Sequence, residues 1–440
     1  MTMEIRLHKN QARSYAAAIH QVARDTLASG NPADRILNAY FRDMKKLGSR
    51  DRRMIAETLF GLFRWWGWLR RIPASQADIW QRGREESPEW AAMLSLAYHL
   101  DHDASHPVAL EWLQIAGLPD VPPMAANAPL AEKARVIGDL GRMAAPDAAA
   151  LVPEWLRPQV ALNDDAYLAL LDYLQRRPPL WLRAQADRDA LIETLRGEGL
   201  QPIASSALSQ AICLEQARVN LFELESFRRG QFELQDAASQ MIGLAADARG
   251  GERWWDACAG AGGKSLQLAA MMGNKGTVVA SDIRAYKLDE LRKRARRAGF
   301  SNIAPRAWED RRLPVKAGSM DGVLVDAPCT GAGTWRRNPD SRWTTRADEV
   351  TEMAALQRDI LSRAAKAVKP GGVLIYATCS LCHAENEATA QAFLAEHAEF
   401  APESWRNPLT GTPTSGLLQV WPMDANCDAT FVARFRRARI

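Results

Sequence analysis

The spacing of apolar residues separates an N-terminal region of helical periodicity from a C-terminal region in which strands and helices alternate. Residues 16–23 and 54–63 place apolar side chains at the three- and four-residue intervals of an amphipathic helix. Ser49, just ahead of the second run, is a candidate helix N-cap. The sequence therefore predicts an all-helical domain over residues 1–145, ending where prolines interrupt the pattern.

The pattern over residues 150–230 predicts a small α+β module. Two short apolar runs, residues 181–184 and 211–214, have the length and composition of strands. Residues 190–197 have helical spacing.

From residue 231 to residue 440, short apolar runs alternate with segments of helical periodicity. This alternation favours an α/β fold, with a parallel sheet that is covered by helices on both faces. The candidate strands are residues 254–257, 277–281, 302–307, 322–326, 373–378 and 430–435.

Composition narrows the class of protein. The chain of 440 residues is 47% apolar and 25% charged, which is typical of globular proteins with more than one domain. A net charge of +4 permits a nucleic-acid partner without requiring one. We see no apolar stretch of about 18 residues and no signal-peptide core, and expect a cytoplasmic protein that does not bind membranes. Six cysteines are too few for a disulfide framework, and no spacing predicts a metal site.

Two basic clusters are candidates for contact with phosphate groups. Residues 287–297 are rich in arginine and lysine, but a solvated helix face explains this run equally well. We expect phosphate contact from the second cluster, because it directly follows a motif containing Cys329. Its members are Trp335, Arg336, Arg337, Arg342 and Trp343.

A glycine cluster, Gly260, Gly262 and Gly263, lies between the first candidate strand of the α/β region and the next helix. Glycines at this turn let the backbone approach a ligand closely. The dinucleotide-binding spacing is not met, because Ser265 stands where a third glycine is required. A Walker-type phosphate loop also fits poorly, since its Gly-Lys-Ser would come later, so a dehydrogenase or a kinase is only the minor alternative. The loop therefore indicates another nucleotide-like cofactor.

Aspartates at the ends of successive candidate strands support a nucleoside site. Asp282 ends the second strand, where an acid typically binds ribose hydroxyls. Asp310 follows the third strand and is a candidate partner for an adenine amino group. A single aspartate at such a position is more often a helix cap. Asp326 repeats the pattern, which favours the nucleoside site.

Two cysteines follow two other candidate strands. Cys329 belongs to Asp-Ala-Pro-Cys-Thr-Gly after residues 322–325, and Cys379 belongs to Thr-Cys-Ser after residues 373–376. A buried structural cysteine is the common alternative, but it fits poorly at the strand ends where ligands bind. Cys379-x-x-Cys382-His383 also matches a haem-attachment pattern, which would require export, and half of a zinc site, whose second half is missing.

Two thiols beside a nucleotide cofactor suit methylation of a pyrimidine ring. Carbon 5 of cytosine is a poor nucleophile until a thiolate adds to carbon 6. A base must then remove the carbon 5 proton before the thiolate is eliminated. Because a free thiol is mostly protonated at pH 7, the site must also activate it. Asp326, Cys329 and Cys379 supply suitable groups.

Taken together, these motifs resemble the RNA (cytosine-5) methyltransferase family, in its bacterial RsmB/Sun-like branch, which acts on 16S rRNA. The matching segments are spread over most of residues 231–440. They occur in the same order and at the same spacing as in the family. The matching segments are residues 235–240, 256–265, 281–282, 326–334, 337–340, Gln357, 376–381 and 385–387.

The resemblance implies a Rossmann-like, seven-stranded methyltransferase domain over residues 231–440 that binds S-adenosylmethionine. By this analogy Cys379 is the nucleophile, Cys329 assists product release, and Asp326 contacts the cytosine. Gly260-Ala261 replaces the usual Ala-Pro of the cofactor loop and removes a rigid proline. The implied cofactor contacts are Cys258, Ala259, Gly260, Ala261, Gly262, Gly263, Lys264, Asp282, Asp310 and Asp326.

The N-terminal region resembles, more faintly, the NusB-type helical RNA-binding domain, and residues 150–230 would correspond to a small RNA-binding module. We expect a monomer that methylates ribosomal RNA, with Trp335 and Trp343 stacking on flanking nucleotides. Transfer RNA is the alternative substrate. A non-catalytic, RNA-binding ribosome-assembly factor is the alternative from another class of function.

Overall fold

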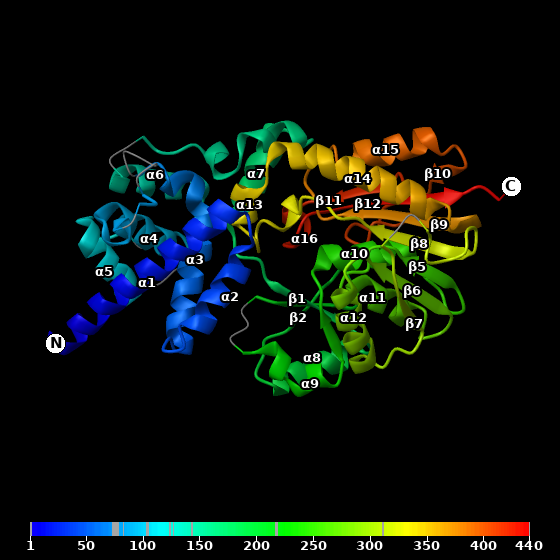
Figure 1. Ribbon diagram of the computed structural model, residues 1–440, viewed down its shortest axis with the longest axis horizontal. Coiled ribbons are helices and arrows are strands. Elements are labelled where there is room, and N and C mark those ends of the chain that lie inside the picture. Colours follow the sequence, from blue (N-terminus) through cyan, green and yellow to red (C-terminus); the bar gives the residue numbers. More distant parts are fainter. Residues whose placement is uncertain are drawn as a thin grey trace. The chain divides into compact units, whose positions relative to one another are not determined.

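The computed structural model describes residues 2–439 except 73–78, 82, 103–104, 123–124, 126, 142–143, 216–218 and 310–311, and only the backbone of residues 2–7. The chain divides into two compact units (Figure 1). The helical unit comprises Met1–Arg177 and Trp335–Arg346, and the sheet unit comprises Pro178–Thr334 and Ala347–Ile440. No helix among the described residues is long and apolar enough to cross a membrane.

The helical unit extends beyond the predicted boundary at residue 145, because helices continue to Gln175. Trp65, Trp68, Trp90 and Trp112 are fully buried in its core. The predicted N-cap is wrong by one residue: Ser49 is the first helical residue, and Gly48 is the cap, its N–H bonded to Asp51. The elements are α1 (Thr2–Ser29), α2 (Ala33–Asp43), α3 (Ser49–Leu69), η2 (Arg84–Glu86), α4 (Pro88–Asp101), α5 (Pro107–Ala116), α6 (Leu130–Gly141), η3 (Ala148–Leu151), η4 (Glu154–Gln159), α7 (Asp164–Gln175) and α13 (Ser341–Thr344).

The segment Trp335–Arg346 completes the core of the helical unit. Trp335, Arg336 and Arg342 are fully buried, and Trp343 donates its indole N–H to the Phe63 carbonyl at 2.6 Å. The expected contact of Trp335, Arg336 and Arg342 with RNA is therefore wrong for these side chains. A guanidinium has enough donors to satisfy several carbonyls in a protein interior. Arg342 donates to the carbonyls of Arg64, Leu151 and Leu174 and to the Gln175 side chain.

Replacing Arg342 by methionine is expected to destabilise the protein by roughly 2–4 kcal/mol, because buried acceptors lose their donors. Burial lowers the pKa of Arg342 to about 9, which shows that burying its charge costs free energy. The variant no longer buries this charge, and this gain offsets part of the free energy lost with the hydrogen bonds. The melting temperature should fall by roughly 5–15 °C. Arg71→Met, at an exposed position, is the matched control. Equal melting temperatures for the two variants would contradict the structural role of Arg342.

The sheet unit begins with a small antiparallel sheet of strand order β2-β3-β1-β4. Its two predicted strands and its predicted helix are present, and the short strands β2 and β4 were not predicted. Leu182, Leu195, Ile212 and Phe232 are fully buried between the sheet and its helices. The elements are β1 (Leu180–Ala184), α8 (Arg188–Gly197), β2 (Ile203–Ala204), β3 (Ala211–Leu214), η5 (Leu221–Glu223), α9 (Glu225–Arg228) and β4 (Phe232–Leu234).

The large sheet has the order β10-β12-β9-β8-β5-β6-β7, with β11 paired to β12. Strands β5 to β9 are parallel, and β10, β11 and β12 pair antiparallel. The predicted α/β fold and all its candidate strands are confirmed. The strands are β5 (Arg253–Asp256), β6 (Thr277–Asp282), β7 (Ile303–Ala307), β8 (Met320–Asp326), β9 (Val368–Thr378), β10 (Phe400–Pro402), β11 (Leu417–Val420) and β12 (Thr430–Arg437).

Helices cover both faces of this sheet (Figure 1). Val323 and Val325 pack toward α14, whereas Leu324 between them packs toward α10 and α11. Burial on both faces explains why these strands are continuous apolar runs. The helices are α10 (Ala237–Ala246), α11 (Gly263–Met271), α12 (Ala285–Arg297), η6 (Ala332–Thr334), α14 (Ala347–Ala365), α15 (Glu387–Glu396) and α16 (Pro422–Ala425).

Candidate active site

The carboxyl ends of the parallel strands bring the predicted motifs to one edge of the large sheet. Strand β5 lies between β6 and β8, and β8 lies beside β9. The glycine loop after β5 is therefore placed between Asp282 at the end of β6 and Asp326 at the end of β8. The loops carrying Cys329 and Cys379 follow the neighbouring strands β8 and β9. Open α/β sheets bind ligands at such an edge.

The glycine loop combines close packing with an open backbone. Gly262 has a φ of +87°, and a Cβ there would lie 2.6 Å from the Leu291 side chain of α12. Gly260 has a φ of +52°, but nothing lies within 4 Å of the position of its missing Cβ. Gly262 therefore lets α12 pack against the loop, while Gly260 leaves backbone accessible to a ligand.

Asp282 is buried and fixed by hydrogen bonds. Its carboxylate accepts the Gly260 N–H at 2.9 Å and also bonds Arg284 through backbone and side chain. Burial raises the pKa of Asp282, but the bonds and charge of Arg284 outweigh it, so the pKa lies below its usual value. The next residue, Ile283, is 67% exposed and offers an apolar surface. Asp310 lies outside the described residues.

Asp256, at the end of β5, is fully buried, and burial raises its pKa to about 7. One carboxyl oxygen accepts the Ser265 hydroxyl at 2.6 Å. The other, Oδ1, has no partner among the described residues. A protonated or weakly ionised carboxyl fits this environment, because an unpaired charge would be costly to bury.

Because of Asp256, the free energy of unfolding should fall as pH rises from about 4 to about 7. In that window folded Asp256 keeps a proton that the unfolded chain has released, so proton release favours unfolding. Asp256→Asn removes this dependence while keeping an oxygen for Ser265. The stability of the variant relative to wild type should therefore increase over this range, by at most about 1.4 kcal/mol per pH unit. Denaturant titrations at several pH values measure it; a constant difference would contradict the raised pKa.

Lys264 and Asp326 form an ion pair between α11 and the end of β8. Lys264 Nζ lies 2.7 Å from Asp326 Oδ2, and both side chains are largely shielded from water. Burial lowers the pKa of Lys264, but the charge and hydrogen bond of Asp326 outweigh it and raise the pKa. The ammonium group therefore stays charged and restrains the Asp326 carboxylate.

The sulfur atoms of Cys329 and Cys379 lie 3.3 Å apart, close enough for a thiol to hydrogen-bond a thiolate. Both residues are partly exposed. The bond from Cys329 lowers the pKa of Cys379, and this effect together with the charge of Lys264 outweighs burial and the charge of Asp326, which raise it. The same bond raises the pKa of Cys329. Of the two thiols, Cys379 therefore ionises more readily, and Cys329 is the better hydrogen-bond donor.

A buried network around Glu385 holds the two cysteine loops together. The carboxylate accepts the Thr330 N–H at 2.8 Å and the Thr330 hydroxyl at 2.6 Å, one residue after Cys329. It also accepts the hydroxyl of Ser380, one residue after Cys379. Gln357 of α14 bonds Glu385 at 3.0 Å and the Pro328 carbonyl at 2.9 Å. These residues lie in the matching segments, but no role could be predicted for them, because only the fold brings them together.

The alternative roles weighed for Cys379 and Cys382 receive no geometric support. Cys382 is fully buried, and burial raises its pKa to about 12. No group of three or more metal-binding side chains occurs in the part of the chain that the structure describes.

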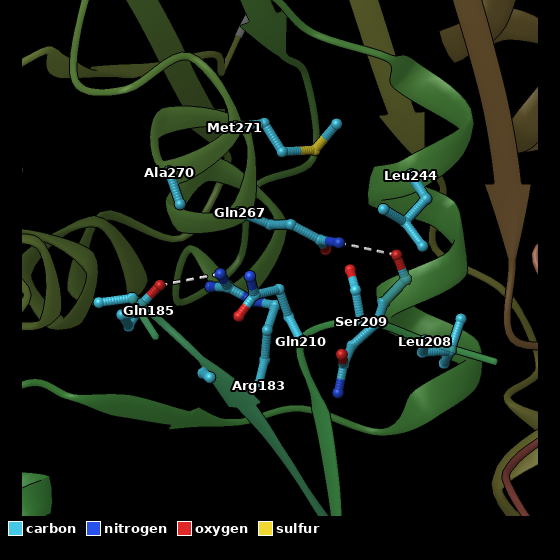
Figure 2. Close-up of a pocket in the computed structure, with 12 residues that line it drawn as sticks. Arg183, Gln185, Leu208, Ser209, Gln210, Leu244, Gln267, Ala270 and Met271 are labelled. Carbon is cyan, nitrogen blue, oxygen red and sulfur yellow. Dashed lines mark hydrogen bonds between the residues drawn. The ribbon is translucent and has the colours of Figure 1, made fainter. Parts of the chain in front are cut away.

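A separate cavity of about 320 Å³ lies in the sheet unit. Its lining includes Gln240 of the matching segment 235–240, but none of the candidate catalytic or cofactor-binding residues. Figure 2 shows Arg183 and Gln267 pointing into this region between β1, α10 and α11. Arg183 bonds the side chains of Gln235 at 2.6 Å and Gln185 at 2.8 Å. The site at the sheet edge therefore remains the candidate for chemistry.

Comparisons with known proteins give a consistent result. The family model for "16S rRNA methyltransferase RsmB/F" matches residues 244–436. A probable ribosomal RNA small subunit methyltransferase B from Synechocystis is 32% identical over 283 residues, covering 61% of this chain and 63% of the relative. This chain matches the first curated relatives over less than two thirds of their length.

Solved structures share the fold. The crystal structure of PH0851 has a TM-score of 0.73 at 23% identity and covers 98% of this chain and 99% of that chain. A methyltransferase homologue from Pyrococcus horikoshii has a TM-score of 0.52 at 25% identity, covering 61% of this chain and 90% of that one. The architecture is thus that of the Rossmann-like methyltransferases.

Proposed function

Because residues 244–436 belong to the RsmB/F family of 16S rRNA methyltransferases, we propose that this protein methylates carbon 5 of a cytosine in small-subunit ribosomal RNA. The observation that carries the chemistry is the pair of sulfurs 3.3 Å apart, beside the Lys264–Asp326 ion pair. Such a target atom is inaccessible in a base-paired helix, so the cytosine must be unpaired or flipped out.

The residues at the edge of the sheet fit S-adenosylmethionine. The open backbone at Gly260 and the neighbouring loop would hold the amino-acid part, and Asp282 would bond ribose hydroxyls. The exposed side chain of Ile283 would cover a face of the adenine ring. When bound, this cofactor supplies an electrophilic methyl group.

Cys379 acts as the nucleophile in this proposal. Its thiolate, favoured by Lys264 and by the hydrogen bond from Cys329, adds to carbon 6 of the cytosine. The new sulfur–carbon bond makes carbon 5 electron-rich enough to accept a methyl group. Asp326, restrained by Lys264, would bond the ring nitrogens and so orient the base.

Cys329 would assist release of the product. The hydrogen bond to Cys379, burial and the charge of the Cys379 thiolate together raise the pKa of Cys329. Once Cys379 is bonded to carbon 6 that charge is gone, and Cys329 ionises more easily. It can then receive the carbon 5 proton, directly or through water, as the sulfur–carbon bond breaks and Cys379 leaves as a thiolate.

The helical unit and the small antiparallel sheet would bind RNA around the target. This part of the proposal rests on the resemblance of residues 1–145 to NusB-type domains and on the position of the small sheet in the chain. The buried Trp335–Arg346 segment contributes to it only by completing the helical unit.

The test is transfer of labelled methyl from S-adenosylmethionine to unmodified small-subunit RNA, as naked RNA and in particles, followed by nucleoside analysis. Labelled 5-methylcytosine with wild type, and none with Cys379→Ala, is the expected result. Transfer RNA is assayed in parallel as the alternative substrate. No labelled nucleoside on any of these RNAs would reject the proposal, and another methylated base would reject the cytosine chemistry.

A further inference from the structure

The fold divides the basic run on α12 into two groups. Arg294 and Arg297 bond the carboxylate of Glu233 in β4, with Arg294 Nη2 at 2.8 Å. Glu233 is almost fully buried, so these two arginines attach α12 to the small sheet. Lys293 and Arg296, by contrast, are exposed and form no ion pair with any residue that the structure describes. One side of the basic run on α12 therefore holds the fold together, and the other side is exposed and can contact a ligand.

The available side of α12 continues into the turn after α9. A Cβ at Gly230 would lie 2.2 Å from the Arg297 carbonyl, so this turn and the end of α12 are in direct contact. The guanidinium of Arg297 also lies 3.9 Å from the centre of the Phe227 ring. Arg228 follows that ring, is exposed, and has no ion pair within the described chain. The exposed cations of α9 and α12 thus lie on segments that are in direct contact.

An exposed aromatic ring lies against Phe227, the ring that Arg297 covers. Phe222 is 60% exposed, and its ring meets Phe227 edge-on with centroids 5.1 Å apart. This contact fixes the ring while leaving most of it in solvent. A fixed aromatic ring beside basic side chains is the arrangement on which single-stranded nucleic acids stack their bases.

We propose that Phe222, Arg228, Lys293 and Arg296 bind a single-stranded segment of the RNA substrate outside the catalytic edge. This inference rests on the proposed function and names one surface with which the protein would bind its RNA substrate. The three cations would contact phosphates, and Phe222 would stack on an unpaired base. A duplex offers phosphates but hides the faces of its bases, so the aromatic ring favours a single strand.

The test uses the full chain and a fluorescein-labelled, unstructured RNA of roughly 12 nucleotides, within the site sizes of such surfaces. The combined variant Arg228→Ala, Lys293→Ala, Arg296→Ala should lose roughly 10- to 100-fold in affinity near 0.1 M salt. Its plot of log affinity against log salt should be less steep by about 2. The matched control removes the same charge from exposed lysines of the same unit: Lys275→Ala, Lys316→Ala and Lys366→Ala.

The aromatic ring has its own test. Phe222→Leu should weaken single-strand binding about tenfold with an unchanged salt slope, and should leave binding of the matched duplex unaltered. Equal losses in the basic variant and the lysine control would overturn the surface, as would a Phe222→Leu variant that binds like wild type. Affinity for S-adenosylmethionine, measured by calorimetry, should stay constant in all variants. A wild type that methylates no RNA would reject the proposed function itself, which is a different outcome.

Discussion

Cys329→Ala is expected to leave the protein covalently bonded to its RNA. In this variant Cys379 still adds to carbon 6, but the group that assists elimination is missing. The sulfur–carbon bond then persists, and a protein–RNA complex should survive denaturing electrophoresis with end-labelled RNA. Loss of the hydrogen bond at 3.3 Å also raises the pKa of Cys379, so the complex should form faster as pH rises.

Two further variants assign the two sulfurs. Cys379→Ala should lower methyl transfer on the order of 10⁴-fold or more and form no complex, because no nucleophile remains. The double variant should also form none. If the complex accumulates with Cys379→Ala and is absent with Cys329→Ala, the two roles are reversed.

Glu385→Ala should lower the methyl-transfer rate by about 10²-fold or more, although its carboxylate bonds neither sulfur. Its bonds to Thr330 and Ser380 hold the loops that carry Cys329 and Cys379. Without them the sulfurs separate, and Cys379 loses the donor that stabilises its thiolate. Single-turnover rates measure the loss, and the pH dependence of Cys379 alkylation should shift to higher pH.

Glu387→Ala is the matched control for this experiment. Glu387 lies two residues further on, is partly exposed, and bonds His383 at 3.2 Å. The Glu387→Ala variant should transfer methyl groups at the wild-type rate, and its Cys379 should be alkylated with the wild-type pH dependence. A Glu385→Ala protein that is slow but keeps the wild-type alkylation profile would show that the network acts through stability alone.

The strands of the large sheet could be predicted from the sequence because of how they are buried. Both faces of β8 are covered, so residues such as Val323 and Leu324 are apolar regardless of the face on which they lie. The short edge strands β10 and β11 were missed, since few residues carry their pattern. The motif cysteines were located correctly at one edge, because parallel topology alone brings their loops together.

Side-chain environments could not be predicted in the same way. The segment with Trp335, Arg336 and Arg342 has the composition of an RNA-binding loop, yet it is buried. Whether an arginine meets phosphate or protein carbonyls depends on acceptors supplied by distant residues, here Arg64 and Leu174. The role of Glu385 was missed for the same reason, since its partners are Thr330, Gln357 and Ser380.

The insertion of Trp335–Arg346 into the helical unit has a consequence for synthesis of the chain. Residues 1–177 leave the ribosome long before residue 346, yet the core of their unit lacks α13 and the buried Arg342 until then. The first unit to be synthesised is therefore among the last to be completed. Until then, carbonyls that Arg342 will bond, such as that of Leu151, remain without this donor. A nascent chain arrested at residue 200 should accordingly be digested by protease faster than one arrested beyond residue 400.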